Sequence, residues 1–397
     1  MKILVIGPFP EPIFGVSLSN VVLTTGLRTK GFKVKTINTS TSKKINPTSG
    51  DWSFSKLVFF KYYLQLFKVI NSDVIYCTTG QSFFGILKYA PFVLLARVLN
   101  RKTVVHVKGG YLKASYENMN NFKKIVSKRV LQLYNKGIVL SESLKPLLEE
   151  FLDPEKIFIQ HNFIQHSLIL SEKEVFKRKD FEGIRIIFLS NLIPEKGIYQ
   201  LLDALDELNS KGTKFEAKIA GHIPNNQQGI IERMSKIKNL EFIGVVRDNV
   251  KADLLSWGNV FCLPTYYSME GQPISILEAM ACGVVPVCLN MRSGITELIE
   301  NGKTGYIVDD RDEHFIETIK KLKADNQIWE QMSLNARQLV KENFSLEISC
   351  DSYSSFFNNL DVNIVKKVRI PSRLRLPKIN QDLSRADTRN QNLILLN

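Results

Sequence analysis

The chain has 397 residues, too many for one ordinary hydrophobic core, so two domains are expected. Its 44% hydrophobic and 23% charged residues are typical of a globular protein. The sequence contains no run of about 18 apolar residues, so no membrane-spanning helix is predicted. The strand-like stretch at the N-terminus is too short for a signal peptide. The five cysteines form no C-x-x-C pair and the five histidines are scattered, which argues against a disulfide framework and a metal cluster and favours a reducing compartment.

Positive charge is concentrated in the first part of the chain. Residues 1–165 carry 23 Lys and Arg against 9 Asp and Glu, a surplus equal to the net charge of +14 of the whole chain. The tail from Ile364 carries a further +6, and the residues between carry −6. One strongly basic domain predicts an anionic partner, for which the candidates are an anionic membrane surface, a lipid-linked phosphate or nucleic acid.

Short apolar runs alternate with helix-length segments through the first 160 residues, which predicts βαβ units and a parallel sheet. The predicted strands are Lys2–Gly7, Phe32–Ile37, Asp73–Cys77, Lys102–Val107, Gly137–Leu140 and Lys156–Gln160. Leu18–Lys30 predicts a helix that Gly31 ends, and the apolar stretch Ser82–Leu99 predicts a buried helix. Asn120–Leu133 predicts an amphipathic basic helix, whose cations suit either a solvated face or a membrane surface.

A polar segment, Gln165–Gly183, predicts a linker to a second βαβ series. Its predicted strands are Ile184–Leu189, Phe215–Gly221, Leu240–Val245, Asn259–Leu263, Val284–Leu289 and Tyr306–Val308. Its predicted helices are Ile198–Ser210, Asn249–Trp257, Ser275–Cys282, His314–Leu322, Gln327–Asn343 and Ser345–Leu360. The D-x-D triplet Asp310–Asp312 lies in a polar turn and is more typical of a turn than of a metal site, and the tail Ile364–Asn397 is expected to be poorly ordered.

The most informative stretch is Pro264–Pro286, where a buried strand leads through a polar loop into a helix. Glu270 lies in the loop and Glu278 in the first turns of the helix. Unpaired N–H groups at a helix N-terminus favour an anion such as phosphate. Two carboxylates beside it suit sugar hydroxyls near a diphosphate, because an ionised carboxylate only accepts hydrogen bonds. Acidic residues are also common at a solvated helix start, so the pair alone leaves both interpretations open.

The wider sequence resembles the retaining family-4, or group 1, glycosyltransferases of the GT-B fold. The resemblance is carried by Glu270-Gly271, Leu277–Val287, Gly294–Ile299 and Asn301–Tyr306, with the two glutamates as the family's E-x7-E pair. It extends over most of the chain and implies an α/β fold of two Rossmann-like domains facing a cleft, with a last helix that crosses back to the first domain. We therefore expect an acceptor-binding domain at 1–165 plus about 345–363, a nucleotide-sugar domain at 183–344, and a basic tail at 364–397.

The same resemblance implies site residues in the first domain. Gly15 corresponds to a glycine of the family's phosphate loop, where the backbone approaches the diphosphate of the donor. Relatives carry a histidine that contacts the transferred sugar at the position of His106, of Lys108 or of both, so His106 is a candidate and Lys108 a possible replacement. A lone histidine at a strand end is otherwise more often structural. Relatives usually carry proline where His161 stands.

In the second domain, Lys196 corresponds to the family's diphosphate-binding lysine, and Asn191 stands where relatives usually carry an arginine. The resemblance implies that Glu278 binds ribose hydroxyls and Glu270 binds the transferred sugar. Pro273 has no N–H group, so the backbone donors to the diphosphate are expected at Gly271, Gln272 and Ile274. The expected catalytic residues are Glu270, His106 and Lys196, and the expected donor-binding residues are Gly15, Asn191, Lys196, Glu270, Gly271, Gln272, Ile274 and Glu278.

The function implied is retaining transfer of a sugar from a nucleotide-diphosphate donor to a lipid-linked or saccharide acceptor in bacterial surface polysaccharide synthesis. No cofactor or metal is expected, because Lys196 and helix dipoles neutralise the leaving diphosphate. We expect a cytoplasmic protein, peripheral at the inner face of the plasma membrane, with an anionic membrane surface rather than nucleic acid as its partner. The rivals are a nucleotide-sugar epimerase of the same shape, against which the E-x7-E pair argues, and a non-catalytic membrane or nucleic-acid binding protein, which the missing arginine at Asn191 favours.

Overall fold

The computed structural model describes residues 1–11, 15–40, 60–165, 168–169, 171–177, 182–224, 227, 229–291, 293–309 and 313–360. Residues 1–361 form one compact unit. The triplet at 310–312, the tail from 364, the loop residue Phe14 and parts of the expected linker lie outside the described residues. No helix in the described part of the chain has the length and apolar character needed to span a membrane.

The first domain is built on a six-stranded parallel sheet with the order β2-β1-β3-β4-β5-β6. The strands are β1 (Lys2–Gly7), β2 (Lys33–Asn38), β3 (Val74–Thr78), β4 (Lys102–His106), β5 (Lys136–Val139) and β6 (Ile157–Ile159). Each predicted strand is present with its bounds shifted by one or two residues at most. The chain order changes direction between β1 and β3, which creates a crevice at the carboxyl ends of these two strands.

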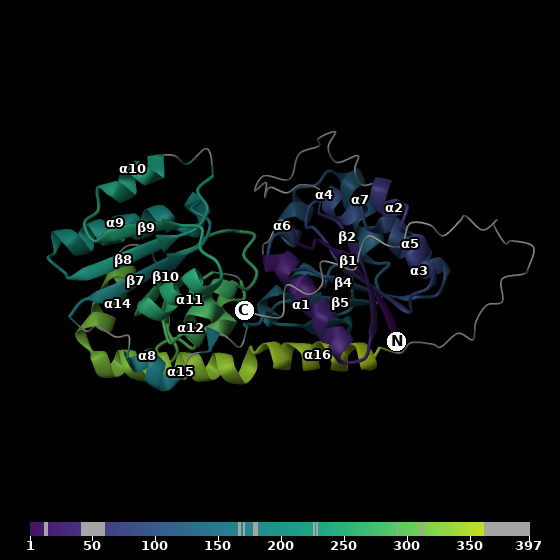
Figure 1. The fold of residues 1–397 in the computed structure, drawn as a ribbon. Helices are drawn as coiled ribbons and strands as arrows, with labels where there is room; N and C mark the ends of the chain where they lie inside the picture. The colour runs from purple at the N-terminus through teal and green to yellow at the C-terminus, as the bar shows by residue number, and fades with distance from the viewer. Residues whose placement is uncertain are drawn as a thin grey trace, which may run out of the picture. The chain divides into compact units, whose positions relative to one another are not determined.

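Helices cover both faces of this sheet (Figure 1). They are α1 (Gly15–Thr29), α2 (Phe60–Tyr63), α3 (Phe67–Ile70), α4 (Phe83–Leu87), α5 (Ala90–Val98), α6 (Leu112–Glu117) and α7 (Asn121–Leu131), with the 3-10 helices η2 (Glu142–Leu147) and η3 (Pro154–Lys156). The face that carries Leu4, Ile75 and Val105 packs in one apolar cluster with helices α2 to α7. The other face carries Tyr76, whose ring packs on Phe357 near the C-terminus.

The prediction of one buried helix at Ser82–Leu99 is wrong, because the structure has two helices there, α4 and α5. The Ser82 side chain caps α4 by accepting a hydrogen bond from the N–H of Gly85. Pro91 lies in the first turn of α5, the place in a helix where a missing N–H group costs nothing. The outer face of α5 is not buried, since the side chain of Val98 is 82% exposed.

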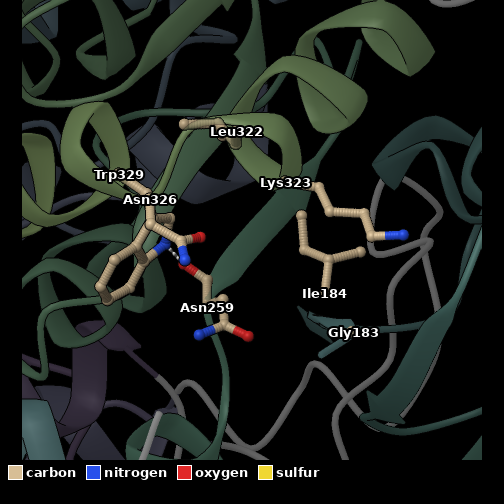
Figure 2. Close-up of a pocket in the computed structure, with 7 residues that line it drawn as sticks. All are labelled: Gly183, Ile184, Asn259, Leu322, Lys323, Asn326 and Trp329. Atoms are coloured by element: carbon tan, nitrogen blue, oxygen red, sulfur yellow. Dashed lines mark hydrogen bonds between the residues drawn. The ribbon is translucent and has the colours of Figure 1, made fainter. Parts of the chain in front are cut away.

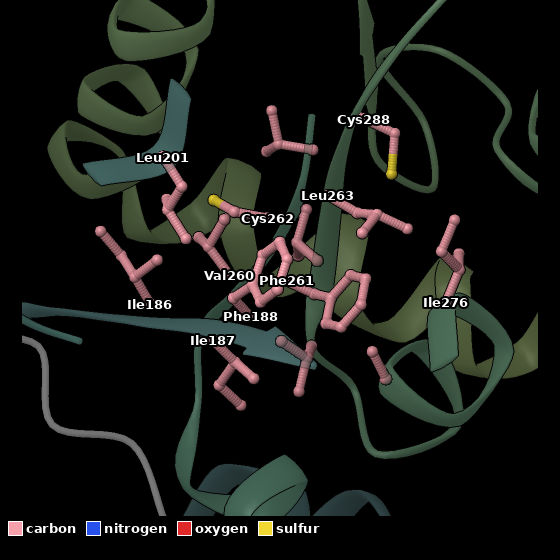
Figure 3. Close-up of a cluster of buried hydrophobic side chains, with 14 of the residues drawn as sticks. Ile186, Ile187, Phe188, Leu201, Val260, Phe261, Cys262, Leu263, Ile276 and Cys288 are labelled. Atoms are coloured by element: carbon pink, nitrogen blue, oxygen red, sulfur yellow. The ribbon is translucent and has the colours of Figure 1, made fainter. Parts of the chain in front are cut away.

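The second domain has another six-stranded parallel sheet, with the order β12-β11-β10-β7-β8-β9. Its strands are β7 (Ile184–Leu189), β8 (Phe215–Ala220), β9 (Leu240–Gly244), β10 (Val260–Leu263), β11 (Val285–Leu289) and β12 (Tyr306–Val308). The centre of this sheet is fully apolar, and Figure 3 shows Phe188 and Phe261 packed among the aliphatic side chains of β7 and β10. Here the chain order changes direction between β7 and β10, which places a second crevice at their carboxyl ends.

The helices of the second domain follow the predicted pattern. They are α9 (Ile198–Ser210), α10 (Gly229–Ser235), α11 (Asp248–Trp257), α12 (Ile274–Ala281), α13 (Ile295–Leu298), α14 (Glu313–Ala324) and α15 (Asn326–Asn343), with the 3-10 helix η5 (Pro194–Lys196). The expected linker contains a helix, α8 (Glu172–Lys177), that the sequence did not predict. Val175 of α8 is buried, and a Cβ atom at Gly283 would lie 2.6 Å from it, so α8 packs on the second domain.

The last described helix, α16 (Leu346–Asn358), packs on the first domain, as expected for a helix that crosses back. The Cys350 side chain meets Gly26 of α1 so closely that a Cβ atom at Gly26 would clash with it. Ser352 donates a hydrogen bond of 2.8 Å to Gln160, which follows β6. The predicted α/β architecture of two parallel-sheet domains with a returning C-terminal helix is therefore confirmed.

Candidate active site

A pocket of about 300 Å³ lies at the carboxyl ends of strands from both sheets. Its walls come from the segments that follow β1, β4 and β6 in the first domain and β7 and β10 in the second. The lining residues are Gly15, Lys108, Asn162, Leu189, Ser190, Lys196, Met269, Glu270, Gly271, Gln272, Pro273, Ile274 and Ser275. The carboxyl ends of parallel strands are where open α/β sheets bind ligands, so the position of this pocket agrees with a binding site.

Two helix N-termini meet at this pocket. The 15-residue helix α1 begins at Gly15, and α12 begins at Ile274 behind Pro273, with no side chain capping its first N–H groups. A Cβ atom at Gly15 would lie 3.7 Å from the Ile274 side chain, so the two helix starts are close neighbours. Converging N-terminal N–H groups give this end of the pocket a positive potential that favours an anion.

Lys196 and Glu270 form an ion pair inside the pocket, with Lys196 Nζ 2.5 Å from Glu270 Oε2. Their side chains are 13% and 9% exposed, so water screens the pair little. The Lys196 ammonium also lies 4.7 Å from the centre of the Tyr267 ring. A buried lysine beside a buried carboxylate can bind an anion and a hydroxyl group side by side.

The backbone around Lys196 is held against the loop after β10. Tyr266 donates its backbone N–H to the carbonyl of Glu195 at 2.8 Å, and the Thr265 hydroxyl donates to the same oxygen at 3.2 Å. Gly197 follows with φ of +80°, and a Cβ atom there would lie 2.1 Å from the carbonyl oxygen of Pro264. Only glycine fits such a contact in the left-handed region, and this close approach fixes Lys196 beside Glu270.

A second close approach joins the loop after β4 to the loop after β10. Gly110 donates its N–H to the carbonyl of Met269 at 3.2 Å. A Cβ atom at Gly110 would lie 2.4 Å from the carbonyl oxygen of Glu270, and one at Gly271 would lie 3.0 Å from that of Lys108. These glycines let two backbones touch and bring Lys108 to the wall opposite the glutamate.

Lys108 donates a hydrogen bond of 2.5 Å from Nζ to the hydroxyl of Ser19 on α1. Burial lowers the pKa of Lys108 from its ordinary value to about 7. Lys108, the possible replacement for a sugar-contacting histidine, therefore lines the pocket near the N-terminus of α1. Its lowered pKa lies near neutral pH.

The Gln272 side chain is fully used in contacts within the protein. Its Oε1 accepts the backbone N–H of Asn162 at 2.6 Å, and its Nε2 lies 3.0 Å from His161 Nδ1. The Asn162 amide nitrogen in turn donates to the carbonyl of Gln272 at 2.7 Å. This side chain therefore orients the loop, which leaves its backbone N–H as the group that can face a ligand. Asn162 is a lining residue that the sequence did not single out.

Glu278 is not among the lining residues, but it lies one helical turn beyond Ser275 of α12, which is. Its Oε1 is 2.6 Å from Lys251 Nζ on α11. Burial raises the pKa of Glu278, and the Lys251 charge lowers it in part. The sequence did not predict Lys251 as a neighbour, because the two residues are 27 positions apart and share no motif.

His106, an expected catalytic residue, is not among the residues that line the pocket. The side chain is fully buried, its Nδ1 is hydrogen-bonded to the Tyr76 hydroxyl, and its ring packs near Tyr353 of α16. Burial and the nearby Lys108 charge hold the pKa of His106 well below its usual value. Histidine 106 thus belongs to the core between the first sheet and α16, and a neutral ring is what that apolar site requires.

Asn191, an expected donor-binding residue where relatives usually carry an arginine, is exposed and is not among the residues that line the pocket, although its neighbours Leu189 and Ser190 are. Two further parts of the described chain, its possible metal ligands and a small second cavity, form no candidate site. In the described part of the chain, no group of three or more His, Cys, Asp or Glu side chains could hold a metal ion. A small cavity of about 20 Å³ lies at the opposite, amino ends of β7 and β10, where Asn259 accepts a hydrogen bond from Trp329 (Figure 2).

Comparison with known proteins agrees with this geometry. Residues 171–339 match the family model of glycosyl transferases group 1. WcaL of Salmonella typhimurium, whose name places it in colanic acid biosynthesis, is 29% identical over 41% of this chain and 42% of its own length. The capsular polysaccharide biosynthesis glycosyltransferase CapM of Staphylococcus aureus is 28% identical over 43% of this chain and 45% of its own length. The chain thus spans less than half the length of these curated relatives.

Solved structures share the fold over nearly the whole chain. Anabaena HepE in complex with UDP superposes with a TM-score of 0.69 at 16% identity, over 91% of this chain and 100% of HepE. Sucrose-phosphate synthase of Thermosynechococcus elongatus superposes with a TM-score of 0.70 at 16% identity, over 90% of this chain and 98% of its own. The architecture is therefore the GT-B fold, and residues 171–339 resemble the group 1 glycosyl transferases.

Proposed function

We propose that this protein is a retaining glycosyltransferase that moves a sugar from a nucleotide-diphosphate donor to a saccharide or lipid-linked acceptor in the synthesis of a bacterial surface polysaccharide. The observation that carries the proposal is the pocket in which Lys196 pairs with Glu270 beside the N-termini of α1 and α12. The names of WcaL and CapM, and the UDP bound to HepE, support the class of pathway and of donor.

In this proposal the diphosphate lies against the two helix starts. Lys196 and Lys108 flank it, and the N–H groups of Gly271, Gln272 and Ile274 donate to its oxygens. Negative charge on the diphosphate grows as the bond to the sugar breaks, so these fixed donors stabilise the transition state more than the bound donor. The positive charge they supply is why we propose transfer without a metal ion.

The sugar lies beside Glu270, whose second carboxylate oxygen can accept hydrogen bonds from its hydroxyls. The acceptor hydroxyl attacks the anomeric carbon from the face that the diphosphate leaves. The bond between carbon and phosphate oxygen breaks, the new glycosidic bond forms, and the acceptor proton passes to the leaving phosphate oxygen. The anomeric configuration is thereby retained. Ribose hydroxyls of the nucleotide bind Glu278 at the edge of the pocket.

An anionic membrane surface is proposed as the place where the acceptor is met. On α7, Phe122 and Ile125 are 70% and 53% exposed and are flanked by Lys124 and Arg129. On α5, Val98 is 82% exposed next to Arg97. Residues 60–136 hold thirteen lysines and arginines against two acidic residues. Exposed apolar side chains between cations suit a lipid headgroup layer better than nucleic acid, because apolar groups gain by insertion into a bilayer.

A transfer assay tests the proposed function. The protein is incubated with UDP-, GDP- and ADP-sugars and a membrane-lipid extract carrying saccharide acceptors. Two quantities are measured: the free nucleoside diphosphate, and the anomeric NMR signals of the product. Release of one diphosphate for each glycosidic bond, with the donor's anomeric configuration kept, is expected. An altered sugar that stays on the nucleotide would identify an epimerase instead. Binding to lipid or nucleic acid without any turnover would indicate a non-catalytic binding protein.

A further inference from the structure

An ion pair joins two helices at the edge of the pocket. Lys251 lies in the first half of α11, and its Nζ contacts Oε1 of Glu278 in the middle of α12 at 2.6 Å. Ser275 lines the pocket and lies three residues before Glu278, so both side chains share one side of α12. The carboxylate is therefore held one helical turn from the pocket lining by a neighbouring helix of the same domain.

This pair differs from the ion pairs at the surface of the protein. The Glu278 side chain is 12% exposed and that of Lys251 is 25% exposed, whereas Glu232 on α10 and Lys236 just after it are 73% and 68% exposed. A carboxylate that loses its water must be compensated by a partner or become protonated. Burial raises the pKa of Glu278, and Lys251 is the charge that opposes this rise. Lys251 thus favours the ionised form of a buried carboxylate.

Among the described residues, the other surroundings of Glu278 supply no comparable charge. Helix α12 also packs against α15 and β11. The charged residue buried on α15, Arg337, lies 3.5 Å from Glu172 of α8. Across the pocket stand the charged groups Lys108, Lys196 and Glu270. In the described part of the chain, Lys251 Nζ donates a hydrogen bond to Oε1 of Glu278, which leaves Oε2 to accept from a ligand.

We propose that Lys251 is a positioning residue for the donor: it orients the Glu278 carboxylate so that Oε2 accepts hydrogen bonds from the two ribose hydroxyls of the nucleotide. The inference rests on the proposed function, since it assigns a partner to the ribose-binding glutamate. Both hydroxyls of a ribose are donors, and a carboxylate fixed by a second bond accepts them without losing rotational freedom on binding. A protonated or rotating Glu278 would bind ribose poorly.

The test is titration calorimetry with the nucleoside diphosphate that the parent protein binds most tightly, at about pH 6 and about pH 8.5. Lys251→Met should bind at least about tenfold more weakly than the parent at the lower pH, the loss expected for a charged hydrogen bond. The ratio of the parent's affinity to that of Lys251→Met should be smaller at the higher pH, where Glu278 ionises without the Lys251 charge. Taking the ratio removes the titration of Lys108 and of the nucleotide, which both proteins share.

Three further variants complete the test. Lys251→Arg should restore binding, because arginine keeps the cation. Lys236→Met, which removes the lysine of the exposed pair Lys236–Glu232, should bind like the parent. In a Glu278→Gln background, Lys251→Met should cause no additional loss, because Lys251 acts through the carboxylate. Thermal unfolding of each variant checks that it is folded. If Lys251→Met does not fold, the Lys251→Arg variant still allows the test.

Two outcomes would overturn the inference alone. One is a Lys251→Met variant that binds like the parent at both pH values. The other is a loss that is equal at both pH values and persists in the Glu278→Gln background, because Lys251 would then contact the nucleotide directly. A parent protein that binds no nucleoside diphosphate would overturn the proposed function and this inference together, so the two failures are distinguishable.

Discussion

Lys196 Nζ lies 2.5 Å from Glu270 Oε2, although 74 residues separate the two in the sequence. The pair exists because β7 and β10 are neighbours in the second sheet, so the loops that follow them leave the same edge side by side. Hydrogen bonds from Thr265 and Tyr266 to the Glu195 carbonyl then fix the distance between the loops. The fold thus builds a cation and an acceptor into one pocket wall.

Gly197→Ala should destabilise the protein more than a matched glycine substitution. Gly212→Ala is the control, because Gly212 also has a positive φ, of +66°, but no atom within 4 Å of a Cβ atom. The left-handed conformation alone should cost each variant about 1–3 kcal/mol. Gly197→Ala should lose more, since its Cβ atom would lie 2.1 Å from the Pro264 carbonyl oxygen. Urea unfolding measures both, and equal losses would mean that the two loops are not in contact.

Gly15→Leu should block the pocket and leave the fold intact. The nearest atom to a Cβ at Gly15 is 3.7 Å away, so the new side chain can only extend into the space between the two helix starts. Gly229→Leu, at the open start of α10, is the matched control. Binding of a nucleoside diphosphate should fall at least about tenfold in Gly15→Leu with an unchanged melting temperature. Unimpaired binding would show that the phosphates do not approach α1.

Binding of a nucleoside diphosphate should take up a proton through Lys108. Burial lowers the pKa of Lys108 to about 7, so its amine is mostly neutral above that pH, and a neighbouring phosphate would raise the pKa again. Affinity should therefore fall as pH rises from about 7 to about 9, with uptake of up to about one proton per ligand. Calorimetry in buffers of different ionisation enthalpy measures the uptake. Lys108→Met should show almost none, and an equal uptake would contradict the assignment.

Phe122→Ser with Arg129→Gln should weaken binding to anionic vesicles. Sedimentation with phosphatidylglycerol vesicles should bring down the parent, and salt or pure phosphatidylcholine should release it, because each cation near such a surface contributes about 1 kcal/mol. Ile231→Ser, which removes an exposed apolar residue of α10, is the control and should bind like the parent. Parent protein that stays in solution with anionic vesicles but binds RNA in a salt-dependent way would reject the membrane proposal in favour of nucleic acid.

The sequence predicted the strands well because buried parallel strands are continuous apolar runs bounded by polar turns. Ile184–Leu189 and Tyr306–Val308 have the predicted bounds. The helix at Ser82–Leu99 was predicted as one because its composition is apolar throughout, and the break depends on Pro91 starting a new helix. Helix α8 was missed because its short, charged sequence has no clear periodicity and is held by contacts of Val175 with residues more than a hundred positions away.

Only the site residues that belong to sequence motifs were predicted. Glu270, Lys196, Gly15 and Ile274 lie in or beside the pocket because each follows a strand whose end the motif marks. His106 is not among the lining residues, because its side chain lies on the face of β4 that packs near Tyr353 of α16, and a sequence does not reveal which face that is. Asn162 and Lys251 carried no signal, since each meets its partner through tertiary packing of distant segments. Their roles can be read only from the distances in the fold.

The most direct test of the central claim, that this pocket holds the diphosphate of a nucleotide sugar, is calorimetric titration with UDP, GDP and ADP. Each titration is run with magnesium and with a chelator, on the parent and on Lys196→Met. The account predicts that the parent binds one nucleotide equally well under both conditions and that Lys196→Met binds it at least about tenfold more weakly, since a charge-assisted contact is lost. Absence of binding by the parent, or equal binding by Lys196→Met, would contradict it.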